Sequence, residues 1–147
     1  VEQWVDEAVA SGARVVIGGQ RDGAKLFPTV VADVTPAMRI SQEEVFGPTL
    51  SVTKAANIDE AITLANDSSY GLGAGIFTND DTSAMRFARE VDAGDIHVNW
   101  TPLWRADLMP YGGLKGSGIG KEGIRYAVDE MTELKTVIIH GLERRNT

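Results

Sequence analysis

Short β-rich runs alternate with longer amphipathic segments along this chain, and this alternation strongly constrains its fold. Helical patterns that open at Asn57 and at Asp80 or Asp81 each place their apolar residues on one helical face. The same reasoning predicts helices at 1–10 and 124–131, and strands at 13–17, 27–31, 49–52, 73–77, 96–98 and 134–139. Strands that alternate with helices in this way are typical of an α/β fold, so we expect a mainly parallel sheet flanked by helices.

The composition is that of an ordinary globular domain. The chain has 147 residues, of which 43% are hydrophobic and 24% charged, and no repeat or linker interrupts it. We therefore expect residues 1–147 to form a single structural unit. No apolar run approaches the length of about 18 residues that a membrane span needs, so a membrane partner is not expected. The net charge of −7 argues against a nucleic-acid partner.

The chain contains no cysteine, which limits its chemistry. It can form no disulfide, thiolate metal site or thiol nucleophile. We expect neither histidine, His97 or His140, to be catalytic, and no spacing of His, Asp and Glu suggests a metal site. The first ten residues lack the pattern of a signal peptide, which favours the cytoplasm.

Six glycines crowd residues 112–123, and residues 118–123 satisfy the dinucleotide pattern G-x-G-x-x-G. That pattern binds a pyrophosphate only where a buried strand leads into it, and residues 111–117 are no such strand. A Walker A loop also fails, because Lys115 stands where a glycine is needed and Glu122 where a Ser or Thr is needed. We expect these glycines to serve tight turns and close packing.

Motifs in a fixed order give a more specific prediction. They lie at 43–48, 66–72, 94–99, 110–122 and 135–137. In this order they resemble the E-E-[IV]-F-G-P, N-x-x-x-Y-G-L, G-x-[IV]-x-[VI]-N and P-[FY]-G-G-x-K-x-S-G-x-G-x-E elements and the last strand of the NAD(P)-dependent aldehyde dehydrogenase superfamily. The resemblance covers the C-terminal part of the catalytic domain. Residues 105–110 further resemble the subgroup that acts on lactaldehyde, glyceraldehyde 3-phosphate and phosphonoacetaldehyde.

In that family the preceding half supplies the coenzyme domain, the catalytic cysteine and a glutamate general base. The resemblance therefore implies that the coenzyme domain is absent here and that no catalytic residue lies in this chain. The start at Val1, without an initiator methionine, also favours a fragment. The parent protein is expected to oxidise an aldehyde to a carboxylic acid with NAD or NADP, through a cysteine thiohemiacetal and a thioester. The chain alone is expected to be inactive.

The resemblance assigns two coenzyme-binding residues. Glu44 is expected to accept hydrogen bonds from the hydroxyls of the nicotinamide ribose, and the ring of Phe46 is expected to pack beside the nicotinamide. An ionised carboxylate is suited to this role because it accepts two hydroxyl donors. The alternative for Glu44 is a surface carboxylate ahead of a turn at Gly47 and Pro48.

A second group is expected to line the aldehyde pocket. The loop at 99–111 carries Trp104, Arg105 and Tyr111. The planar guanidinium of Arg105 is suited to bind the carboxylate or phosphate of an anionic aldehyde. The alternatives are a structural pair of Arg105 with Asp107 or the main chain, and ordinary packing for the tryptophans.

The other class of function is structural. In the family the final strand, here near 135–139, extends a sheet between subunits, so a homo-oligomer is expected. An apolar strand left unpaired would be an aggregation hazard. The alternative to the enzymatic role is therefore a non-catalytic folding and assembly module.

Overall fold

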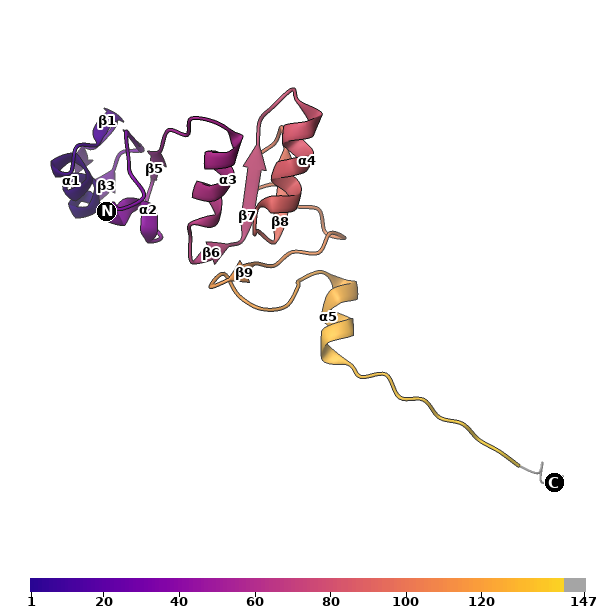
Figure 1. Cartoon of the computed structure of the whole chain (residues 1–147). Coiled ribbons are helices and arrows are strands. Elements are labelled where there is room, and N and C mark those ends of the chain that lie inside the picture. The colour runs from indigo at the N-terminus through magenta and orange to yellow at the C-terminus, as the bar shows by residue number, and fades with distance from the viewer. Residues whose placement is uncertain (142–147) are drawn as a thin grey trace.

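The computed structural model describes residues 1–141, and Figure 1 shows the arrangement of their helices and strands. The helices are α1 (Glu2–Ala10), α2 (Arg39–Gln42), α3 (Ile58–Asn66), α4 (Asp81–Glu90) and α5 (Ile124–Met131). The strands are β1 (Arg14–Ile17), β2 (Arg21–Asp22), β3 (Lys25–Leu26), β4 (Thr29–Ala32), β5 (Thr49–Val52), β6 (Tyr70–Gly71), β7 (Gly73–Ile76), β8 (Asp95–Val98) and β9 (Leu114–Lys115). The predicted α/β class is confirmed.

The N-terminal part is built on a three-stranded sheet in the order β1-β4-β5. Strand β4 runs antiparallel to β1 and parallel to β5, and β2 and β3 form a short antiparallel hairpin. The side chain of Val31, on β4, is fully buried at the centre of a hydrophobic cluster. The other buried members of this cluster are Val5, Ala8, Ala13, Val34, Met38 and Ile40. Helices α1 and α2 thus cover this sheet with their apolar residues.

A second hydrophobic cluster holds the central part of the chain together. Here β7 runs parallel to β8, and α3 and α4 pack beside the pair (Figure 1). The buried residues are Ile62 on α3 and Phe87 on α4, with Val91 just beyond α4. The parallel pairing that we expected is found in β4–β5 and β7–β8, whereas β1–β4, β2–β3 and β6–β9 are antiparallel. Within residues 1–141, parallel and antiparallel pairs therefore both occur, and the β1-β4-β5 sheet contains both.

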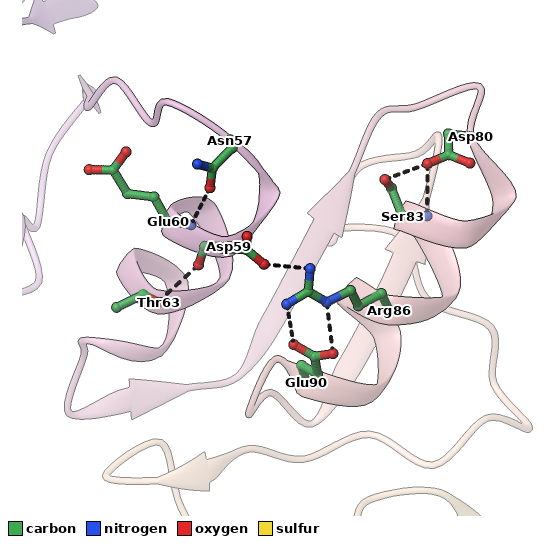
Figure 2. Close-up of polar contacts among 8 residues, drawn as sticks. All are labelled: Asn57, Asp59, Glu60, Thr63, Asp80, Ser83, Arg86 and Glu90. Atoms are coloured by element: carbon green, nitrogen blue, oxygen red, sulfur yellow. Dashed lines mark hydrogen bonds and ion pairs between the residues drawn. The ribbon is translucent and has the colours of Figure 1, made fainter.

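Both central helices begin at the predicted N-caps. The side chain of Asn57 accepts a hydrogen bond from the backbone N–H of Glu60 at 3.0 Å (Figure 2). Asp80 accepts bonds from the backbone N–H groups at the start of α4 and from the hydroxyl of Ser83 at 2.5 Å. The bond from the Ser83 hydroxyl is the main reason that the pKa of Asp80 lies below its usual value. These caps satisfy amide groups that a helix start leaves without partners.

An arginine links the two central helices across their surface. Arg86 on α4 pairs with Asp59 on α3 at 2.5 Å and with Glu90 one turn along its own helix at 2.9 Å (Figure 2). These two carboxylates raise the pKa of Arg86. The pairs are exposed, so they align the helices more than they stabilise the fold.

Asn66 joins the ends of the same two helices. Its side-chain amide donates to the carbonyl of Glu90 at 2.7 Å and accepts from the backbone N–H of Asp92 at 2.8 Å. Its own carbonyl accepts a bond from the ammonium of Lys115 at 3.0 Å. The asparagine that opens the second motif therefore fixes the end of α3 against both α4 and the glycine-rich loop.

The segment at 134–139, which we expected to be a strand, pairs with no other part of residues 1–141. After α5 the chain runs away from the rest of the molecule (Figure 1), and the apolar side chains of Leu134, Val137, Ile138 and Ile139 are exposed. A strand exists only through hydrogen bonds to a neighbour, and the described part of this chain offers none here. Within residues 1–141, no helix has both the length and the apolar character that crossing a bilayer requires.

Candidate functional site

The glycine-rich loop is held against the segment that follows α3. Strand β9 pairs antiparallel with β6. Beside this pair, the hydroxyl of Ser117 accepts the backbone N–H of Gly71 at 2.9 Å, and the backbone N–H of Gly116 donates to the carbonyl of Ser69 at 2.8 Å. Two motifs that lie far apart in the sequence thus form one surface.

Close packing explains two of the glycines in this region. A Cβ atom on Gly94 would overlap the carbonyl oxygen of Gly112, and a Cβ on Gly112 would overlap the carbonyl oxygen of Gly120. The packing role predicted for the glycines at 112–123 is confirmed at Gly112. The pattern at 118–123 follows the two-residue strand β9 and a turn, so it lacks the buried strand that a dinucleotide-binding loop needs.

Glu44 lies at the edge of a hollow of about 560 Å³ between the N-terminal part and the glycine-rich loop. One side is formed by residues 41–44, and the opposite side includes 70–73 and Ser117. Among residues 1–141 the carboxylate of Glu44 has no hydrogen-bond partner, whereas that of its neighbour Glu43 pairs with Arg39 at 2.9 Å. The position suits a ligand-binding carboxylate and equally a carboxylate at the surface.

Phe46 does not reach this hollow. Its side chain is 87% exposed, at the centre of the turn in which the backbone N–H of Gly47 donates to the carbonyl of Val45 at 2.9 Å. The structure thus brings Glu44 to the hollow and leaves the ring of Phe46 at the surface.

The loop at 99–111, which carries the residues predicted for the aldehyde pocket, begins at Asn99, and hydrogen bonds to Thr78 hold this residue in place. The side chain of Asn99 accepts a bond from the backbone N–H of Thr78 at 2.8 Å and donates to the carbonyl of Thr78 at 3.0 Å. Asn99 also adopts a positive φ of 57°, which asparagine tolerates better than most residues. The last residue of the third motif therefore turns the chain away from β8 and into the loop.

Trp104 packs on the edge of a histidine. Its ring centroid lies 6.2 Å from that of His97, with the two planes at 79°. His97 in turn contacts the carboxylate of Asp95 at 3.0 Å, and both of these side chains are largely buried on β8. These contacts favour the packing alternative for Trp104 and give His97 a structural setting.

Arg105 is held by Tyr111, at the far end of the loop, and by Glu122, which lies beyond the loop. Its Nη1 donates to a carboxylate oxygen of Glu122 at 3.0 Å, and its guanidinium carbon lies 4.3 Å from the centre of the Tyr111 ring. The backbones of Tyr111 and Glu122 bond to each other in both directions, at 3.1 and 2.6 Å. Two of the three residues predicted for the aldehyde pocket, Arg105 and Tyr111, therefore meet in one cluster.

The partner of Arg105 differs from the alternative that the sequence suggested. Within residues 1–141 the arginine pairs with Glu122, so the alternative that predicted a pair with Asp107 is wrong. Sequence reasoning missed Glu122 because it lies 17 residues away from Arg105. The only signal was its place at the end of the motif at 110–122.

One residue of each predicted group, Glu44 and Tyr111, lines a hollow, and the two hollows adjoin. Tyr111 and Glu122 border a second hollow of about 350 Å³, which shares Leu72 and Ser117 with the hollow beside Glu44. Trp104 and Arg105 border neither of them. Across residues 1–141, no three His, Asp or Glu side chains are grouped so that they could hold a metal ion.

Comparisons with known proteins agree with the motif order. A model of the aldehyde dehydrogenase family matches residues 1–137. A 3-sulfolactaldehyde dehydrogenase from Priestia megaterium is 49% identical over 140 residues, which are 95% of this chain and 29% of that protein. A lactaldehyde dehydrogenase from Methanococcus maripaludis is 44% identical over 142 residues, 97% of this chain and 30% of that protein.

Among solved structures, the chain is similar to the glyceraldehyde-3-phosphate dehydrogenase GapN from Methanocaldococcus jannaschii, which was crystallised with NADP. The TM-score is 0.87 at 38% identity, over 94% of this chain and 30% of that chain. The chain thus spans about 30% of the length of these relatives. It belongs to the aldehyde dehydrogenase family.

Proposed function

We propose that this chain is part of an NAD(P)-dependent oxidoreductase that converts a small anionic aldehyde to a carboxylic acid. The observation that carries the proposal is the guanidinium of Arg105, which Tyr111 and Glu122 hold in the loop at 99–111. A planar guanidinium binds phosphate, sulfonate or carboxylate oxygens through paired N–H donors. Two of the three relatives are named for a sulfonated or a phosphorylated aldehyde, while lactaldehyde is uncharged.

The chain would bind and orient the substrate without supplying the nucleophile. A thiohemiacetal and a thioester need a thiolate, and none of the 147 residues is cysteine. The thiolate would therefore come from a segment outside this chain. Arg105 would hold the anionic end of the aldehyde, and Trp104 and Tyr111 would limit the space around it.

Glu44 and Phe46 are the proposed coenzyme contacts. The carboxylate of Glu44 is exposed at the edge of a hollow and has no partner within residues 1–141, so it is free to accept hydroxyl groups of a ribose. The exposed ring of Phe46 offers an apolar face to a nicotinamide. NAD or NADP, when bound, would accept the hydride that leaves the substrate.

Substituting Glu44 tests the coenzyme site. In a longer protein that contains this chain, Glu44→Gln should raise the KM for NAD(P) about tenfold, because the neutral amide accepts hydroxyl donors more weakly than a carboxylate. The KM for the aldehyde should change little. Steady-state kinetics with the coenzyme as the varied substrate measure this.

Glu43→Gln is the matched control, because the Glu43 carboxylate pairs with Arg39. It should leave the KM for NAD(P) within about twofold, as expected for an exposed pair. Equal effects of the two substitutions would contradict the role of Glu44.

A second candidate function is that of a non-catalytic folding and assembly module. The exposed apolar side chains at 134–139 favour it, since an extended apolar segment can be covered by a strand of another subunit. We propose a homo-oligomer on this basis. We propose separately that the parent protein lies in the cytoplasm. This role and the binding role are compatible within one parent protein.

A further inference from the structure

We propose that Glu122 determines how strongly this site prefers an anionic substrate. Its carboxylate lies against Arg105 and opposes the binding of a second negative group there. Removal of this charge should therefore strengthen anion binding. The inference rests on the proposed function, because it concerns the residue that Arg105 contacts before an anion arrives.

The pair of Arg105 with Glu122 is exposed. The side chain of Arg105 is 39% exposed and that of Glu122 is 68% exposed, and Nη1 lies 3.0 Å from the carboxylate oxygen. Ion pairs in contact with water are weak, because solvent screens the charges. An anion from solution can thus compete for the same guanidinium.

The guanidinium has donors beyond those that Glu122 uses. Glu122 accepts one bond, from Nη1. A guanidinium presents five N–H donors in a plane, so an anion can bind along its remaining edge. Glu122 and the bound anion would then share one cation, with their charges a few ångströms apart.

The position of Arg105 should survive the loss of the Glu122 charge. The ring of Tyr111 lies under the guanidinium, and the backbone bonds between Tyr111 and Glu122 do not involve either side chain. A glutamine at position 122 keeps a side-chain oxygen that can accept the bond from Nη1. Glu122→Gln therefore changes the charge while the arrangement of the cluster is kept.

The size of the effect follows from Coulomb's law. Two like charges about 6 Å apart, at an effective dielectric constant of about 40 to 80, repel each other enough to weaken binding about three- to tenfold. Glu122→Gln should remove this repulsion. The KM of an anionic aldehyde should fall by this factor, and that of an uncharged aldehyde should not.

The experiment uses a longer protein that contains this chain and compares glyceraldehyde 3-phosphate with lactaldehyde. With Glu122→Gln, we expect the KM for the phosphorylated aldehyde to fall about three- to tenfold and inhibition by inorganic phosphate to strengthen by a similar factor. The KM for lactaldehyde should stay within about twofold of the unmodified value, because that substrate carries no charge.

Glu130→Gln is the matched control. Glu130 borders the same hollow as Glu122, but its carboxylate accepts the backbone N–H of Lys121 at 2.7 Å and does not pair with Arg105. Glu130→Gln should leave the preference for the anionic aldehyde unchanged. Glu122→Asp keeps the charge and should also retain the KM of the unmodified protein for that aldehyde.

An unchanged or higher KM for the phosphorylated aldehyde in Glu122→Gln would overturn the inference. So would a fall that Glu122→Asp reproduces, because the effect would then come from shape and not from charge. If Arg105→Ala removes the preference for anions while Glu122→Gln has no effect, only the inference fails. If Arg105→Ala lowers kcat/KM equally for both aldehydes, the proposed function fails, and the inference that rests on it fails with it.

Discussion

Replacing Arg105 with alanine in a longer protein that contains this chain should lower kcat/KM for an anionic aldehyde about 10- to 100-fold, the range expected for the loss of hydrogen bonds to a charged group. An uncharged aldehyde makes no such bonds, so its kcat/KM should change by less than about threefold. Steady-state kinetics with glyceraldehyde 3-phosphate and lactaldehyde measure the two effects side by side. The ratio of the two losses separates the contribution of anion binding from any general disturbance of the loop.

Arg105→Lys separates the contribution of charge from that of shape. Lysine keeps the positive charge but lacks the planar set of donors. The kcat/KM of Arg105→Lys for the anionic aldehyde should therefore lie between those of the unmodified protein and of Arg105→Ala. Equal losses for the anionic and the uncharged aldehyde in Arg105→Ala would sink the proposed role of this residue. Arg105 would then be a structural partner of Tyr111 and Glu122.

Phe87→Ala in the 147-residue chain should lower the free energy of unfolding by about 3–5 kcal/mol, which is the usual cost of emptying a large buried site. The side chain of Phe87 is only 7% exposed and packs in the cluster with Ile62 and Val91. Loss of the ring would leave a cavity between α4 and the β7–β8 pair. Urea unfolding followed by circular dichroism measures the change.

Phe77→Ala is the control of the same chemical type. Phe77 follows β7 and is 75% exposed, so the same substitution removes little buried area in this chain. Its effect on the free energy of unfolding should stay below about 1 kcal/mol. If both substitutions cost the same, the burial of Phe87 would be contradicted.

The helices of eight or more residues were predictable because their signals are local, whereas the four-residue helix α2 was not predicted. Asn57 and Asp80 are cap residues, and each is followed by apolar residues at helical spacing, so α3 and α4 begin where the sequence indicates. Strands β6 and β9 have two residues each and were not predicted. They depend on a contact between segments more than forty residues apart, to which no local pattern points.

The segment at 134–139 was predicted as a strand from its residues, but it forms no strand within residues 1–141. The residues at 134–139 have the apolar, β-branched character of a strand, yet nothing in residues 1–141 pairs with them. Strand propensity describes how well side chains fit a sheet, and it supplies no neighbour to pair with. For the candidate site, the sequence motifs made Arg105 and Tyr111 candidates, while their contact with Glu122 required the folded loop.

The most direct test of the central claim is an assay of the isolated chain. The purified 147-residue chain, shown to unfold cooperatively, should form no NADH or NADPH when it is mixed with an aldehyde and the oxidised coenzyme, because it has no thiol nucleophile. A longer protein that adds a cysteine-bearing segment should form it under the same conditions. Turnover that rises in proportion to the concentration of the isolated chain would contradict the account.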